Sequence, residues 1–158
     1  MAKQPSNQPA IKIIAQNRRA RFEFEILEKY EVGMVLLGTE VKSLRQGKCN
    51  LADAYVNEED GELWIVHLDI PEYTHGNRMN HEPKRRRKLL LHRQEIMKIR
   101  QRIREKGLTV VPLSLYFKDS RAKMAIALVR GKNVRDKRAA MAKREAKREI
   151  DKELSRRR

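Results

Sequence analysis

The chain has 158 residues, the length of one domain of ordinary size with room for a tail. It contains 37 Lys and Arg against 21 Asp and Glu, so the formal net charge is +16 and the isoelectric point is near 10.3. Such an excess repels itself unless a polyanion is bound, so nucleic acid is the first candidate partner and an anionic membrane the second. No apolar run approaches the ~18 residues that span a bilayer. The segment MAKQPSNQPA resembles no signal peptide, so we expect a cytoplasmic protein.

The first part of the chain predicts one or two short strands after an irregular start. Residues 1–9 (MAKQPSNQP) are polar, contain two prolines and have no hydrophobic period, so we expect a disordered lead. The segment IKIIA, residues 11–15, is compatible with a strand or with a short helical turn. Phe22, Phe24 and Ile26 alternate with glutamates, which is the period-two pattern of a half-buried strand.

The next segments predict a helix followed by a hairpin. TEVKSLRQG, residues 39–47, has helical spacing of its apolar side chains, and Gly47 is a typical helix stop. Strands are expected at 54–56 and 63–68, because the intervening NEEDGE contains an Asp-Gly pair, a strong signal for a hairpin turn.

A second helix and a second hairpin follow. HRQEIMKIRQRIREKG, residues 92–107, has isoleucines three and four residues apart and ends on glycine. LTVVPLSLYF (108–117) and KMAIALV (123–129) flank the turn-like KDSRA. Pro112 interrupts the first of these strands, and because proline donates no backbone hydrogen bond, it indicates an edge position or a bulge.

These elements predict a mainly β fold with a separate tail. Short antiparallel strands with a few helices favour a small Greek-key barrel, OB-like in architecture, over residues 10–130. From residue 130 onward there are thirteen Lys/Arg, five Asp/Glu and no aromatic residue, so 131–158 is expected to be a basic tail. Its helix formers have little apolar surface, which predicts disorder when free and a helix when docked. Without Trp or Phe it is not expected to bind membranes.

No arrangement of residues predicts catalysis or metal binding. The four histidines have no spacing that would place two ligands on one helical turn, and a single cysteine excludes an internal disulfide and a cysteine-built zinc site. Cys49 follows Lys48, which could lower its pKa, although an inert thiol is the commoner case. RGKN at 130–133 lacks the preceding glycine of a phosphate-binding loop. We therefore expect no enzyme activity, no metal and no cofactor.

Three cationic clusters in the expected barrel favour RNA. They lie in NRRAR (17–21), in KRRRK (84–88), and along and just beyond the helix expected at 39–47. A charge run alone is as readily a solvated segment, but three leucines after KRRRK would hold its cations at a fixed place. Fixed arginines suit phosphate contacts that set register on a folded RNA. The cations expected to contact RNA are Arg18, Arg19, Arg21, Lys42, Arg45, Lys48, Arg85, Arg86 and Arg87.

Four blocks of sequence together resemble the SsrA-binding protein family, SmpB, from about residue 10 to the tail. They are GTEVKSLRQGKCNLADAYV (38–56), RRRKLLLH (85–92), GLTVVPLSLYF (107–117) and RGKNVRDKR (130–138). The resemblance implies an OB-like barrel that binds the tRNA-like domain of transfer-messenger RNA (tmRNA) and delivers it to stalled ribosomes for trans-translation. It also implies that the tail occupies the decoding centre and the empty mRNA channel. The implied partners are tmRNA, small-subunit ribosomal RNA and the stalled ribosome; DNA is not expected.

The resemblance also implies roles for individual residues. Glu40 and Asn50 join the neighbouring cations in the block expected near tmRNA. The residues that fall in the decoding-centre segment are Gly131, Lys132, Arg135, Asp136, Lys137 and Arg138. Arg135 stands where many members have His, so a stacking role there becomes a guanidinium stack or a phosphate contact. Phe22 stands where some have His, which keeps stacking and removes a hydrogen bond.

Two other functions are compatible with the sequence. A ribosomal or general RNA-binding protein would bind unrelated structured RNAs about equally, and an RNA-modifying enzyme would change bound RNA covalently. Alanine at 85–87 should weaken RNA binding and leave the fold intact; unchanged affinity would show that KRRRK is only a solvated segment. Cutting after Gly131 should leave a folded, tmRNA-binding barrel that no longer supports rescue.

Overall fold

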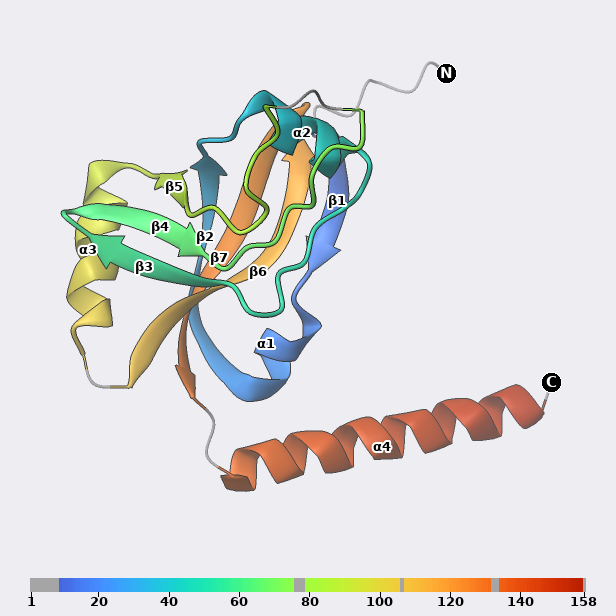
Figure 1. The fold of residues 1–158 in the computed structure, drawn as a ribbon. Coiled ribbons are helices and arrows are strands. Elements are labelled where there is room, and N and C mark those ends of the chain that lie inside the picture. Colours follow the sequence, from blue (N-terminus) through green and yellow to red (C-terminus); the bar gives the residue numbers. More distant parts are fainter. Residues whose placement is uncertain (1–8, 76–78, 106, 132–133, 158) are drawn as a thin grey trace, which may run out of the picture.

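The computed structural model describes residues 9–75, 79–105, 107–131 and 134–157, and only the backbone of 134–140. Of the lead expected at 1–9, only Pro9 is described. Within these residues a barrel of strands carries three helices, and a fourth helix lies outside it (Figure 1). The elements are β1 (Ile11–Gln16), α1 (Arg18–Glu23), β2 (Phe24–Met34), α2 (Gly38–Arg45), β3 (Tyr55–Glu59), β4 (Glu62–Val66), β5 (Arg87–Leu90), α3 (Arg93–Ile103), β6 (Leu108–Lys118), β7 (Arg121–Gly131) and α4 (Val134–Arg156).

The strands form one closed antiparallel sheet. The order is β1-β6-β3-β4-β5-β2-β7, and an additional β6–β7 pairing closes the ring while β1 flanks β6. β3, β4 and β5 are consecutive neighbours, and β2, which precedes them through a long connection, lies beside β5. This is a Greek-key arrangement, so the expected mainly β, OB-like barrel is confirmed.

Both expected hairpins are present with two-residue connections. Asp60 and Gly61 join β3 to β4 with φ of 52° and 79°, and Asp119 and Ser120 join β6 to β7 with φ of 48° and 67°. Two residues with positive φ form the type I′ geometry whose twist matches that of paired strands. The Asp-Gly pair predicted the first turn, whereas the second forms without glycine.

The strand predicted from Phe22 begins at Phe24, because Phe22 and Glu23 complete α1. Asn17 starts this helix by accepting a hydrogen bond from the backbone N–H of Ala20 at Oδ1, 3.2 Å away. Ala20 is buried against the sheet. N-capping and burial of one small residue thus override the alternation that predicted a strand. Residues 11–16 form the strand β1, one of the two structures that the sequence allowed.

Pro112 lies at a bulge, as one of the two sequence alternatives predicted. It pairs with Ile126, and the next paired residue, Ser114, faces Ala125, so Leu113 is the extra residue. The bulge leaves carbonyls that hold α1 on the sheet: Asn17 donates from its backbone N to Leu113 O at 2.7 Å and from Nδ2 to Pro112 O at 3.0 Å. A break in the β6–β7 ladder therefore anchors the first cationic helix.

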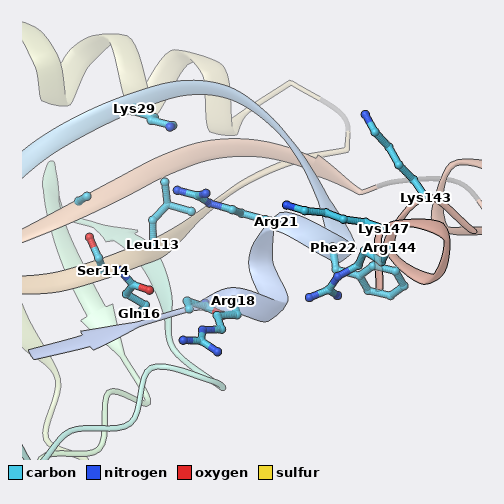
Figure 2. Close-up of a pocket in the computed structure, with 12 residues that line it drawn as sticks. Gln16, Arg18, Arg21, Phe22, Lys29, Leu113, Ser114, Lys143, Arg144 and Lys147 are labelled. Atoms are coloured by element: carbon cyan, nitrogen blue, oxygen red, sulfur yellow. The ribbon is translucent and has the colours of Figure 1, made fainter. Parts of the chain in front are cut away.

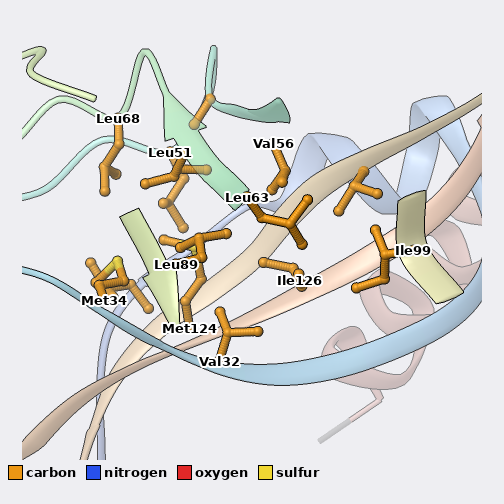
Figure 3. Close-up of a cluster of buried hydrophobic side chains, with 14 of the residues drawn as sticks. Val32, Met34, Leu51, Val56, Leu63, Leu68, Leu89, Ile99, Met124 and Ile126 are labelled. Carbon is orange, nitrogen blue, oxygen red and sulfur yellow. The ribbon is translucent and has the colours of Figure 1, made fainter. Parts of the chain in front are cut away.

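Aliphatic side chains fill the barrel (Figure 3). Leu63, Ile65, Leu89 and Ile126 are almost completely buried there, and Ile99 of α3 packs against the same cluster. Every side chain of α4 that is described, from 141 to 156, is exposed. The tail therefore forms its helix without entering the core.

Candidate nucleic-acid interface

The first candidate surface is the outer side of α1, which Asn17 fixes to the sheet. Arg18, Arg19 and Arg21 are all exposed. Arg19 donates from Nε to a carboxylate oxygen of Glu23 at 2.6 Å, one turn further along the helix. An exposed pair of this kind contributes little to stability, so it can exchange for a phosphate contact at small cost. The structure thus presents all three predicted arginines on one helix.

The second candidate surface follows α2. Lys42 and Arg45 are exposed on the helix, and Lys48 is exposed just beyond Gly47, whose φ of 77° suits the end of a helix. Lys42 Nζ lies 5.6 Å from the centre of the Tyr73 ring. The stripe expected from the sequence is therefore accessible, and its contact with RNA stays a prediction.

Asn50 lies beyond this stripe and shapes the turn that follows. Its Oδ1 accepts a hydrogen bond from the backbone N–H of Ala52 at 2.9 Å. Its backbone pairs with Asp69 through hydrogen bonds of 2.9 and 3.2 Å. The side chain is exposed, so Asn50 can both order the turn and face a ligand.

Glu40 connects α2 to β5 through two arginines. One of its carboxylate oxygens accepts from Arg85 Nη2 and the other from Arg87 Nε, both at 2.5 Å. Arg87 also donates to the carbonyl oxygens of Leu68 at 2.5 Å and Pro83 at 3.0 Å. The side chains of Glu40 and Arg87 are both 0% exposed. This network ties the cationic helix, the strand and the intervening loop together.

The charges in this network are held as a unit. Burial raises the pKa of the Glu40 carboxyl. The Leu37 backbone N–H and the guanidinium groups of Arg85 and Arg87 lower it by more, so the pKa of Glu40 lies below its ordinary value. Burial in turn lowers the pKa of Arg87, and the Glu40 carboxylate opposes that effect. Removing one member of such a pair leaves a buried charge without compensation, which is strongly destabilising.

The structure corrects two expectations for this region. Glu40 and Arg87 were expected to contact RNA, yet neither side chain has any exposed surface with which to do so. Alanine at positions 85–87 was expected to leave the fold intact, yet it would strip a buried carboxylate of both guanidinium partners. Glu40 and Arg87 instead position the α2 surface relative to β5.

Two further cations of KRRRK, Arg86 and Lys88, are partly exposed and paired. Arg86 forms an ion pair with Glu59, and its guanidinium lies 4.2 Å from the centre of the Trp64 ring. Lys88 pairs with Glu62 at 3.4 Å. The run is therefore an ordered turn and strand rather than a solvated segment. Of its three predicted contact residues, Arg85 and Arg86 retain an accessible surface and Arg87 does not.

The three predicted clusters form two surfaces, because Glu40 joins the α2 stripe to KRRRK. Figure 1 shows α2 at one end of the barrel and α1 at the other, where it lies close to α4. The cationic side chains that the sequence identified in the barrel are therefore distributed over both of its ends.

A groove of about 680 Å³ lies where α1, the sheet and α4 meet (Figure 2). Arg144 of α4 lies above Phe22, with 5.9 Å between the guanidinium and the ring centre. The groove contains Arg18 and Arg21, which the sequence pointed to, and further cations that it did not. The described residues that line it are Gln16, Asn17, Arg18, Arg21, Phe22, Lys29, Leu113, Ser114, Ala125, Lys143, Arg144 and Lys147.

The decoding-centre residues expected in the tail are only partly described. Gly131 is exposed at the end of β7, and Lys132 lies outside the described residues. Arg135, Asp136, Lys137 and Arg138 belong to the backbone of α4, and their side chains lie outside the described part. Their roles stay predictions.

The described residues include a free thiol, Cys49, and a buried histidine, His81. Among them, no three His, Cys, Asp or Glu side chains are grouped as metal ligands, and no helix is long and apolar enough to cross a membrane. Burial raises the pKa of the Cys49 thiol to about 12, so it is an unreactive thiol at neutral pH. His81 is buried between Thr39 Oγ1 and Ile70 O, at 2.9 and 2.7 Å. It fastens the loop before β5 to α2.

A closed antiparallel barrel with fixed cations at both ends, and a basic helix outside its core, has the features of a nucleic-acid-binding module. The family model described as "SmpB protein" matches residues 14–156. Proteins named "SsrA-binding protein" from Parafrankia sp. (strain EAN1pec) and Carboxydothermus hydrogenoformans are each 57% identical, over 92% and 90% of this chain and 92% and 96% of theirs. The chain belongs to the SmpB family.

A solved structure supports the same relationship. A chain from the structure described as "tmRNA-SmpB: a journey to the center of the bacterial ribosome" is 47% identical and superposes with a TM-score of 0.65. The match covers 76% of this chain and 85% of that chain. It includes most of the fold and agrees with the barrel described above.

Proposed function

We propose that this protein binds the tRNA-like domain of tmRNA and delivers it to stalled ribosomes for trans-translation. Membership of the SmpB family, the names of the relatives and the similarity to a chain from a tmRNA–SmpB structure support this function. The observation that carries it is a division of the molecule: a closed barrel presents exposed cations, while a basic helix remains outside the core.

The barrel recognises a folded RNA mainly through phosphates and shape. Aromatic residues make up 5% of the chain, so base stacking cannot dominate a large interface. The α2 stripe, Arg85, Arg86 and the arginines of α1 supply cations at fixed positions, which suits the register of a folded, tRNA-like RNA. Asn50 lies beside the stripe, while Glu40 and Arg87 hold this surface in place from inside.

The tail occupies the decoding centre and the vacant mRNA channel. Its basic rows suit a channel lined with RNA backbone, and its acidic row limits nonspecific binding. Gly131, Lys132, Arg135, Asp136, Lys137 and Arg138 form its decoding-centre segment. The protein acts in the cytoplasm by binding and placement, with no covalent chemistry and no cofactor.

Pull-down of the tagged full-length protein from cells, followed by sequencing of the bound RNA, tests this function. We expect strong enrichment of tmRNA over other structured RNAs, together with small-subunit ribosomal RNA. Equal enrichment of unrelated structured RNAs would instead identify a general RNA-binding or ribosomal protein. Covalent change in RNA incubated with the purified protein would identify an enzyme.

Matched charge variants test which surface binds. The triple variant K42Q/R45Q/K48Q removes three exposed cations from the α2 stripe, and R93Q/K98Q/R104Q removes three exposed cations from α3 and its end. We expect the first to weaken binding of the tRNA-like domain about tenfold or more. It should also reduce the slope of log affinity against log salt concentration by about two. The α3 variant should bind nearly as the unsubstituted protein does. Equal losses would show that only net charge matters.

A further inference from the structure

We propose that the groove between α1 and α4 binds an RNA phosphodiester backbone, which side chains of the barrel and of the tail contact together. The bound backbone then fixes the direction in which the tail leaves the barrel. This inference rests on the proposed function and adds to it a specific site, at the end of the barrel opposite the α2 stripe (Figures 1 and 2).

Two separate parts of the chain supply the cations of this groove. Arg18 and Lys29 belong to the barrel, and Lys143 and Lys147 belong to α4. Within the described residues none of these four has a carboxylate partner, and none of the described lining residues is acidic. Like charges that converge on one space repel each other until an anion enters. A polyanion would therefore be favoured between the two parts.

The shape of the groove suits a stretch of backbone with its sugars. Its volume of about 680 Å³ falls within the ~300–1,000 Å³ of ordinary ligand pockets. Leu113 and Ala125 contribute apolar surface from the sheet, and Phe22 contributes an aromatic ring. Cations around an apolar floor match phosphates that flank the less polar sugar faces.

The contact between α4 and the barrel is small without such a ligand. α4 contacts α1, and Arg144 lies above the Phe22 ring at 5.9 Å. All side chains of 141–157 are exposed, so this part of the helix is not fixed by burial in the core. A backbone held from both sides would bridge barrel and helix and would make the orientation of the tail depend on bound RNA.

A double-mutant cycle on the full-length protein tests the joint site. The barrel variant is R18Q/K29Q, the tail variant is K143Q/K147Q, and the control is K152Q/R156Q, which removes two exposed cations further along the same helix. Dissociation constants are measured separately for the tRNA-like domain of tmRNA and for small ribosomal subunits. Thermal melting of each variant checks that the exposed substitutions leave the fold intact.

For the RNA whose backbone occupies the groove, we expect the barrel and tail variants each to weaken binding about tenfold and their combination about thirtyfold, because the effects of cations that share one ligand are not additive. The barrel variant combined with the control should give the product of the separate losses. Coupling with tmRNA alone, or with small subunits alone, would each support the site and identify the source of the backbone.

Two outcomes would overturn the site. If the combined barrel and tail variant lost affinity for both RNAs by the product of the two separate losses, the two sets of cations would act independently. With normal binding by the unsubstituted protein, this result would refute the groove and leave the proposed function standing. Failure of the unsubstituted protein to bind tmRNA or ribosomes would refute the proposed function and the groove with it.

Discussion

The two ends of the barrel differ in how far their cationic side chains are paired with carboxylates. At the α2–β5 end, Arg85 and Arg87 share the buried carboxylate of Glu40, and Arg86 pairs with Glu59 while stacking on Trp64. At the α1–α4 end, the described lining of the groove contains six Lys and Arg side chains and no carboxylate.

The difference separates two uses of arginine in one sequence. A buried, fully hydrogen-bonded guanidinium fixes the geometry of its surroundings and is removed from solvent. An exposed cation without a nearby carboxylate contributes little to folding and remains available to phosphate. The α2–β5 end is therefore stabilised before RNA arrives. At the α1–α4 end, Arg18, Lys29, Lys143 and Lys147 have no carboxylate partner within the described residues, so a bound polyanion would supply their partner charges.

The largest expected effect comes from breaking the buried network. Arg87→Ala leaves the Glu40 carboxylate buried with only Arg85 as a charged partner, and breaking a buried pair costs roughly 3–5 kcal/mol. We expect the free energy of unfolding, measured by urea denaturation, to fall by about that amount.

Arg86→Ala is the control for this change, because Arg86 pairs with Glu59 at the surface. Exposed ion pairs contribute about 0–1 kcal/mol, and the stacking on Trp64 adds a similar amount. A loss for Arg87→Ala no greater than that for Arg86→Ala would contradict the central role of the buried pair.

Acid should weaken the same network. The folded-state pKa of Glu40 lies below its unfolded value of about 4.3, so its contribution is fully present above that pH. It is lost as the pH falls through the folded pKa, since the proton binds the unfolded chain more readily. Urea unfolding at a series of acidic pH values should show a shallower loss for Glu40→Gln than for the unsubstituted protein. Glu62→Gln, at an exposed pair, is the control, and equal slopes for all three would refute the assignment.

A smaller effect is expected at the anchor of α1. Asn17→Ala removes the cap on Ala20 N–H and the donor to Pro112 O, which should cost about 1–2 kcal/mol of unfolding free energy. Asn17→Asp keeps the cap acceptor and loses the amide donor, so it should recover part of the loss. An unchanged melting curve for Asn17→Ala would show that burial of Ala20 alone positions the helix.

Local signals in the sequence predicted much of the fold. The Asp60-Gly61 turn, the helix stop at Gly47 and the bulge at Pro112 each follow from the conformational limits of a few neighbouring residues. α1 was missed although its cap, Asn17, is local in the sequence, because the alternation of Phe22, Phe24 and Ile26 favoured a strand. The β6 carbonyls that hold Asn17 on the sheet are about a hundred residues away in the chain and give no local signal.

The sequence alone did not separate the buried arginine from its neighbours. In KRRRK all five cations look equivalent, and the inward face is fixed by the register of β5, where Arg87 and Leu89 alternate with exposed or half-exposed neighbours. Arg87 lies two residues before the apolar Leu89, and this spacing was the available signal that its side chain faces the core. The groove could not be inferred, because it depends on where α4 lies relative to α1.

The smallest effect on barrel stability is expected from removing the tail. Cutting the chain after Gly131 deletes α4, whose described side chains, from 141 to 156, are all exposed, so they contribute little burial. We expect the free energy of unfolding of the barrel to change by less than about 0.5 kcal/mol, as for surface changes generally. Binding of the tRNA-like domain should persist through the α2–β5 end, while peptide tagging on stalled ribosomes should be abolished.

The same truncated protein distinguishes the roles of the two ends of the barrel. Tagging requires the basic helix to enter a channel lined with phosphates, and docking there would offset the cost of ordering the tail, roughly 1–2 kcal/mol per residue if it is disordered when free. Circular dichroism of a peptide covering 131–158, with and without ribosomes, measures that transition. If truncation removed tmRNA binding together with tagging, the α1–α4 end would be part of the tmRNA site. If full tagging persisted, the tail would be dispensable, and ribosome rescue would depend on the barrel alone.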